Sequence, residues 1–331
     1  MSSGATRSRA QRQRPRPCLR RQRGVALLVA ILLVALGTIL AVKVAYENAM
    51  TARRGSATYA FDESLLIQQG AEALAAYGMR QIHQSDPSHI YAGQGWDKPL
   101  GPIEVVPGVM LEASLEDMQG RLNLNNLVQP NGTPDPAYVA AFTNLLELLG
   151  LEPKWTGFLV DWIDYDIVPQ NPDGAEDSVY MGQVPPYRTA NRYITSPSEL
   201  LALPGFGIDR YMKLAPYITA LPQGTALNVC TALPQVLDAV MGSGHQEFSA
   251  DLQQFATNRS NTKGCFPSNF QATMGQNGVR GASAFRTAQT SQFFRLTSFI
   301  TIGSTEFNLY SLLYQDQTGA LRPIQRSFTA D

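Results

Sequence analysis

The chain has 331 residues, with 26 basic and 27 acidic side chains and a formal net charge of −1. This length allows one large domain or two of modest size. Residues 1–24 carry eight arginines and no acid, which leaves 18 basic and 27 acidic residues in the remainder, a net charge of −9. A basic arm can bind nucleic acid, but the apolar segment that follows the arginines argues against that interpretation.

Residues 25–42 form an uncharged, strongly apolar segment of 18 residues. As a helix it would extend about 27 Å, close to the thickness of the hydrocarbon core of a bilayer. A buried core helix would usually be shorter and apolar on one side only. A secretory signal peptide would end in a small-residue cleavage site, whereas residues 43–47 continue the helical pattern. The arginines in front predict a cytoplasmic N-terminus and place the rest of the chain outside the cytoplasm.

The helix should continue well beyond the membrane, because residues 46–82 contain no proline. Asp86 and Pro87 should end it, which gives a helix of about 55–60 residues. Half would lie in lipid and half would pack against a head. One apolar face recurs at helical spacing and is flanked by Ile67 and Ala71; its members are Leu66, Gly70, Leu74 and Tyr77.

Alternating apolar and polar residues predict strands near both ends of the head. The expected strands are 103–105 and 111–115, joined by a turn at 107–108, and then 293–302, 307–313 and 321–328. The middle is expected to be helical, with candidate helices at 137–149, 155–163, 197–203 and 209–218 and a long glycine-rich loop at 260–285. The predicted fold is α+β, with one antiparallel sheet laid on the long helix and an α-helical insertion.

The junction RRQRG-VALLVAILLV resembles the leader of type IV prepilins. In that superfamily a dedicated membrane peptidase cuts after the glycine, and the new N-terminal residue is usually N-methylated. The resemblance implies cleavage after Gly24, with Val25 as the first mature residue. The family usually has Phe or Met at this position and Glu at the fifth mature position, where this chain has Val29.

Four further strings are similar to those of the K-type minor pseudopilins of type II secretion, general secretion pathway protein K. They run in the family's order and cover most of the chain: EDMQGRLNLNNLV (116–128), LVDWIDYDIVPQNPDGAEDSVY (159–180), PYRTANRYITSPSELLALPGF (186–206) and APYITALPQGTALNV (215–229). The resemblance implies a pilin-like fold. Its expected parts are a cleaved leader (1–24), a transmembrane segment (25–43), a periplasmic helix (44–85), a sheet (86–120 and 286–331) and an inserted helical domain (121–285).

The resemblance also implies a function. The chain is expected to be a single-pass inner-membrane protein with its bulk in the periplasm, and not an enzyme. It would cap the tip of the pseudopilus and initiate its assembly, which drives export of folded proteins. Its expected partners are other minor pseudopilins of a tip complex, the major pseudopilin, the prepilin peptidase and the inner-membrane secretion platform, with no nucleic acid.

Acidic residues cluster between Asp161 and Asp177. Carboxylates held together in a flexible loop suit Ca²⁺, although the spacing does not match an EF-hand. A solvated acidic loop is the alternative interpretation. K-type pseudopilins bind calcium in this insertion, so the resemblance favours a structural Ca²⁺. The expected ligands are Asp164, Asp166, Glu176 and Asp177.

The three cysteines are Cys18, Cys230 and Cys265. Cys18 would leave with the leader, so an even pair would remain in an oxidising compartment. We expect Cys230 and Cys265 to form a disulfide, with two unpaired buried thiols as the alternative.

The segment 200–218 resembles half of a helix-hairpin-helix motif, whose turn can contact DNA phosphates. A membrane-anchored DNA-binding or uptake protein is therefore the alternative function. The segment has only Arg210 and Lys213 as bases, and phosphate binding without positive charge is weak. A membrane-anchored hydrolase has less support, since Gly-X-Ser-X-Gly, His-Glu-X-X-His and Walker-type motifs are absent from the sequence.

Overall fold

The computed structural model describes residues 23–265 and 285–329. The chain divides into two compact units, residues 1–60 and residues 61–331, and each is described by itself. Helix α1 (Arg23–Ser85) has 63 residues and continues from the first unit into the second. Most of the leader and most of the predicted loop 260–285 lie outside the described residues.

The start of α1 is apolar and exposed. An 18-residue window within Gly24–Ser85 has a mean hydropathy of 3.0, and none of it is buried against protein. A helix satisfies its own backbone hydrogen bonds, which a lipid environment requires. This helix is long and apolar enough to cross a membrane once.

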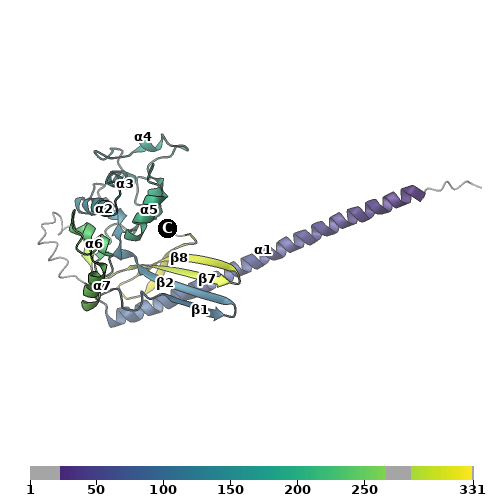
Figure 1. Ribbon diagram of the computed structural model, residues 1–331, viewed down its shortest axis with the longest axis horizontal. Helices are drawn as coiled ribbons and strands as arrows, with labels where there is room; N and C mark the ends of the chain where they lie inside the picture. The colour runs from purple at the N-terminus through teal and green to yellow at the C-terminus, as the bar shows by residue number, and fades with distance from the viewer. Residues whose placement is uncertain (1–22, 266–284, 330–331) are drawn as a thin grey trace, which may run out of the picture. The chain divides into compact units, whose positions relative to one another are not determined.

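Five antiparallel strands form one sheet in the order β1-β2-β7-β8-β9 (Figure 1). The predicted hairpin is confirmed, since Val106 pairs with Val109 around the turn. Strand β2 then pairs with β7 over its whole length, from Val109↔Ile302 to Asp117↔Phe294. The sheet is therefore built from both ends of the head, as predicted; its strands are β1 (Leu100–Val106), β2 (Val109–Asp117), β7 (Phe293–Ile302), β8 (Thr305–Gln315) and β9 (Leu321–Ser327).

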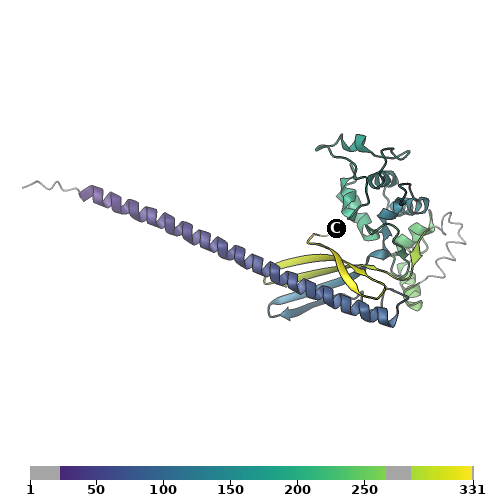
Figure 2. The ribbon, with the colours of Figure 1, turned by 180° about the vertical axis from the view of Figure 1, so that it is seen from behind.

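The last turns of α1 lie along one face of this sheet (Figure 2). Ala71 and Met79 pack in one core with alternate residues of the strands, among them Phe294 and Ile300. Period-two alternation places these strand residues on the covered face, as the sequence predicts. Glu72 is buried beside them and forms a bidentate ion pair with Arg326 at 2.7 and 2.8 Å.

Only the flank of the predicted apolar face of α1 meets the sheet, where Ala71 is buried in the core and Ile67 packs against it. Leu66, Leu74 and Tyr77 are 69%, 50% and 64% exposed, and a β-carbon at Gly70 would meet no atom within 4 Å. The face that meets the sheet also includes polar residues that bond to the strands. Gln68, for example, donates to the carbonyl of Phe307 at 3.1 Å. Leu66, Gly70, Leu74 and Tyr77, here called the α1 stripe, are left without a partner in the described chain.

Residues 118–292 form the insertion between β2 and β7, with a core of its own (Figure 1). Two predicted helices are present almost unchanged, while 197–203 is a 3₁₀ helix and 209–218 ends as a short strand. The α-helices are α2 (Pro136–Leu148), α3 (Trp155–Ile163), α4 (Asp177–Tyr180), α5 (Ile208–Leu214), α6 (Pro234–Met241) and α7 (Leu252–Asn261). The 3₁₀ helices are η1 (Met118–Gly120), η2 (Leu124–Leu127), η3 (Pro197–Ala202) and η4 (Ala215–Tyr217). Two parallel strand pairs join β3 (Leu122–Asn123) to β4 (Ile218–Thr219) and β5 (Leu227–Asn228) to β6 (Thr287–Ala288).

A buried carboxylate joins the insertion to the sheet. Asp117, the last residue of β2, accepts hydrogen bonds from the Gln119 amide and from side chains of Asn228, Thr231 and Ser291. Asp117 thus links the start of the insertion at Gln119 to its body at Asn228 and Thr231. It also links both to Ser291, where the chain returns to the sheet. Burial raises the pKa of Asp117 despite these donors.

Candidate functional site

Three acidic side chains of the insertion converge. Asp161 lies in the last turn of α3, Asp164 directly follows that helix, and Glu176 precedes α4. Oxygen atoms of the three carboxylates lie within 4.8 Å of one another, and all three residues are buried. The turn at the end of α3 brings Asp161 and Asp164 to one face, and the loop between α3 and α4 returns to add Glu176. We call this group the carboxylate cluster.

Asp161 also fixes the loop between α3 and α4. Its carboxylate accepts hydrogen bonds from the Gln170 amide at 3.1 Å and from the Ala175 amide at 2.6 Å. A β-carbon at Gly174 would overlap both the Gln170 amide nitrogen and the Asp161 carboxylate. The close approach of the loop to this carboxylate therefore requires glycine at that position.

The other two carboxylates have fewer hydrogen-bond partners among the described residues. Neither oxygen of Asp164 and only one oxygen of Glu176 has a hydrogen-bond partner among the described residues. Burial, reinforced by the neighbouring carboxylates, raises the pKa of both Asp164 and Glu176 to about 7. Burial raises the pKa of Asp161 to about 6. Buried carboxylates without partners are costly unless they are protonated or bind a cation. An all-oxygen donor set of this kind fits a hard divalent cation.

The cluster contains two of the four predicted ligands. Asp164 and Glu176 meet in it, whereas the carboxylates of Asp166 and Asp177 lie outside the group. Asp166 caps its own turn by accepting from the Val168 amide at 2.7 Å. Asp177 accepts from the amide and hydroxyl of Thr189 at 3.2 and 3.1 Å and lies 3.7 Å from Arg188.

Asp161 was not among the predicted ligands. It is the only acid in the otherwise apolar sequence WTGFLVDWI of α3. A lone carboxylate on the buried face of such a helix needs a local partner. That pattern is the signal in the sequence that could have identified it.

The structure joins Cys230 and Cys265 in a disulfide. Cys230 follows β5 and is completely buried, and Cys265 is the last described residue before 266–284. The bond closes a loop with a sequence separation of 35. It therefore ties the segment that contains α7 to the core of the insertion.

The half-hairpin at 200–218 has little capacity to bind phosphate. Arg210 is held by both oxygens of Glu152, with Nε–Oε2 and Nη2–Oε1 distances of 2.9 and 3.0 Å. This pairing with Arg210 lowers the pKa of Glu152 to about 2, so the pair is ionised at neutral pH. The apolar residues of the segment are buried in the insertion core: Leu200, Leu203, Phe206, Tyr211 and Leu214. The segment is therefore built as packing scaffold, and the DNA-binding alternative loses its support.

Comparison with known proteins finds matches to one protein family. The family described as type II secretion system (T2SS), protein K matches residues 120–223. The type II secretion system protein K of Pseudomonas aeruginosa is 30% identical over 318 residues, which cover 93% of each chain. Its counterpart in Aeromonas hydrophila is 33% identical over 232 residues, covering 66% of this chain and 70% of that one.

A solved structure has the same fold. It is the crystal structure of the GspK-GspI-GspJ complex from the enterotoxigenic Escherichia coli type 2 secretion system. The matching chain is 22% identical, with a TM-score of 0.67 over 84% of this chain and 100% of that one. At this identity the match supports the pilin-like fold. The similarity to the Pseudomonas relative over nearly its whole length identifies the family. The chain belongs to the type II secretion system protein K family of minor pseudopilins.

Proposed function

We propose that this minor pseudopilin caps the tip of the periplasmic pseudopilus and initiates its assembly, which drives export of folded proteins across the outer membrane. The observation that carries the proposal is the place of the insertion. It begins after Asp117 and ends before Phe293, at the end of the sheet where α1 also ends. A subunit stacked against that end of the head would collide with the insertion.

The start of the mature chain supports the same role. In a pilin-like fibre, a Glu at the fifth position can pair with the free amine of a neighbour, which offsets the cost of a charge among apolar helices. The first subunit of a fibre has no neighbour above it and needs no such Glu. This chain has Val29 at that position.

The exposed α1 stripe supports packing against further pseudopilins. Leu66, Leu74 and Tyr77 offer an apolar strip, and Gly70 leaves space for the close approach of another helix. The solved relative is a complex of GspK with GspI and GspJ, so we propose that other minor pseudopilins form a tip complex with this chain. The major pseudopilin, the prepilin peptidase and the inner-membrane secretion platform are the remaining proposed partners.

The proposed site of action is the inner membrane, with the N-terminus in the cytoplasm and the head in the periplasm. The arginines of residues 1–24 and the apolar start of α1 support this orientation. Cleavage after Gly24 and N-methylation of Val25 complete the proposal for the mature chain.

The initiating role can be tested by varying the amount of this chain while the major pseudopilin is held constant. A subunit that starts and caps each fibre should give more and shorter pseudopili as its level rises, measured by electron microscopy. A shaft subunit would leave number and length unchanged, and that result would refute initiation. A matched control is Asp209→Asn, an exposed change on α5, which should behave as wild type.

We also propose that the carboxylate cluster binds a structural Ca²⁺ through Asp161, Asp164 and Glu176. The ion would offset two of the three carboxylate charges of the cluster and hold the loop between α3 and α4. Asp166 and Asp177 stay predicted ligands. Trp162 directly follows Asp161 in α3, and its indole lies 5.2 Å from the ring of Tyr180 in α4, the helix that Glu176 precedes. This placement of Trp162 beside the cluster residues suggests a direct assay. Tb³⁺, a calcium substitute, should emit when Trp162 is excited, and Asp164→Ala should abolish the emission. Unchanged emission in the variant would place the ion elsewhere.

A further inference from the structure

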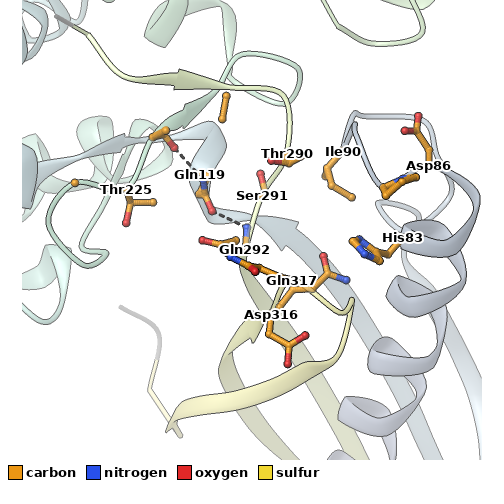
Figure 3. Close-up of a pocket in the computed structure, with 15 residues that line it drawn as sticks. His83, Asp86, Ile90, Gln119, Thr225, Thr290, Ser291, Gln292, Asp316 and Gln317 are labelled. Carbon is orange, nitrogen blue, oxygen red and sulfur yellow. Dashed lines mark hydrogen bonds between the residues drawn. The ribbon is translucent and has the colours of Figure 1, made fainter.

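An open pocket of about 490 Å³ lies where three parts of the head meet (Figure 3). The end of α1 contributes His83, and the segment that follows it contributes Asp86 and Ile90. The turn between β8 and β9 contributes Asp316 and Gln317. The junction of the insertion supplies the remaining wall through Gln119, residues 224–226 and residues 288–292. Its volume is in the range of ligand-binding pockets. The pocket is separate from the carboxylate cluster and from the α1 stripe.

Several polar side chains of this pocket are without a hydrogen-bond partner among the described residues. The structure gives no hydrogen bond to the side chains of His83, Thr290, Gln292 or Gln317 within the described part of the chain. Figure 3 shows His83 and Gln317 pointing toward one another from opposite elements. Carboxamides and hydroxyls can both donate and accept hydrogen bonds. They therefore match the alternating N–H and C=O groups of an extended peptide main chain.

The wall behind these side chains is held in place. Gln119 donates to the carbonyl of Ala226 at 2.9 Å and accepts from the Gln292 amide at 2.6 Å. Ser291 is engaged by Asp117 and Asn228. The pocket is thus preformed by contacts that leave other polar groups free, which lowers the entropic cost of binding.

The charge of the pocket is negative. Asp86 and Asp316 line opposite margins, and no lysine or arginine is among the described lining residues (Figure 3). In each carboxylate Oδ1 caps its own turn, while Oδ2 has no hydrogen-bond partner among the described residues. Burial opposes ionisation of Asp86, but the hydrogen bonds from His89 and Ser88 outweigh it and lower the pKa. Hydrogen bonds from Thr318 lower the pKa of Asp316. The C-terminal end of α1, the negative end of a helix dipole, opens beside them.

We propose that this pocket binds an extended segment of a partner protein that carries two basic side chains. The main chain of the segment would lie against Thr290, Gln292 and Gln317. Its basic side chains would reach Asp86 on one margin and Asp316 on the other. A partner recognised here would be selected by charge and main-chain hydrogen bonds, whereas the α1 stripe selects by apolar contact.

The test uses the full chain in detergent micelles with Ca²⁺ present. The probe is a fluorescent acetyl-Gly-Arg-Ser-Arg-Gly-amide peptide, and its matched control replaces both arginines with citrulline, which keeps the shape and removes the charge. Binding is measured by fluorescence anisotropy. Two partly exposed charge pairs together correspond to about tenfold in affinity. We therefore expect the arginine peptide to bind about tenfold more tightly than the citrulline peptide.

Variants locate the site. Asp86→Asn combined with Asp316→Asn keeps both turn-capping oxygens and should remove the tenfold preference, whereas Asp209→Asn should retain it. Gln317→Trp, an exposed change that narrows the pocket, should weaken both peptides. Equal affinity for the two peptides in wild type, or an unchanged preference in the double variant, would overturn the proposal. Free argininamide that binds as tightly as the peptide would show that main-chain recognition is wrong.

Discussion

Replacing Asp164 with asparagine should have opposite effects on stability with and without calcium. Both oxygens of Asp164 are buried and lack partners among the described residues, so the metal-free chain holds an uncompensated carboxylate. Asparagine has nearly the same shape and no charge. Without metal at pH 8, Asp164→Asn should therefore raise the free energy of unfolding by about 1–3 kcal/mol. With calcium the wild type should be the more stable protein, because only it supplies the full charge to the ion.

The size of the calcium effect can be estimated. A ligand at 100 times its dissociation constant adds about 2.7 kcal/mol to the stability of the state that binds it. For a domain of the size of the insertion this corresponds to a rise in Tm of about 5–10 °C. The assay is thermal unfolding of wild type, Asp164→Asn and the exposed control Asp209→Asn, each with calcium and with chelator.

The pH dependence gives a second measurement on the same samples. The ordinary pKa of 3.8 for Asp164 rises to about 7 in the folded, metal-free chain. The folded state therefore binds the extra proton between these values, and the stability from this group is complete below about pH 4 and lost as the pH rises toward 7. Calcium should reverse the slope, since protons compete with the ion. If wild type and Asp164→Asn keep the same order of stability under both conditions, the carboxylate cluster does not bind the ion.

Three further predictions concern the rest of the chain. Mass spectrometry of the protein from cells should find Val25 at the N-terminus, and an intact leader would contradict the processing. Thiol titration of the unfolded, unreduced mature protein should find no free thiol, whereas two would contradict the disulfide. Cys265→Ser should lower the free energy of unfolding by about 3–4 kcal/mol, because the disulfide closes a loop with a sequence separation of 35. Asp117→Asn would place an amide donor against the four groups that donate hydrogen bonds to Asp117. Urea unfolding should therefore show a free energy of unfolding lower by about 2–4 kcal/mol, with no change in Asp209→Asn.

The sheet could be predicted because its signals are local. Alternation in 293–302 reports the buried face directly, and Phe294 and Ile300 lie in the core as expected. The contact face of α1 could not be predicted in this way. Its buried side includes Gln68 and Glu72, whose partners Phe307 and Arg326 are more than 200 residues away in sequence. A hydrophobic pattern cannot anticipate polar groups that are satisfied by distant strands.

The carboxylate cluster was only partly predictable, because its geometry also depends on contacts that the local sequence does not show. The acidic segment 161–177 indicated a cation site, but the choice among its members depends on the path of the loop. Asp161 faces inward because the Gln170 and Ala175 amides return to it. Asp177 faces Thr189 and Arg188 instead. The pocket beside His83 left no local pattern, because three separate parts of the chain form it.

The position of the head in the fibre tests the central claim most directly. Extended pseudopili that contain an epitope in the insertion can be labelled with gold and imaged by electron microscopy. If the chain caps the fibre, label should lie at one end only, with one labelled end per pseudopilus. Label spaced along the shaft would contradict the cap and would show that the insertion does not prevent subunits from stacking along the fibre.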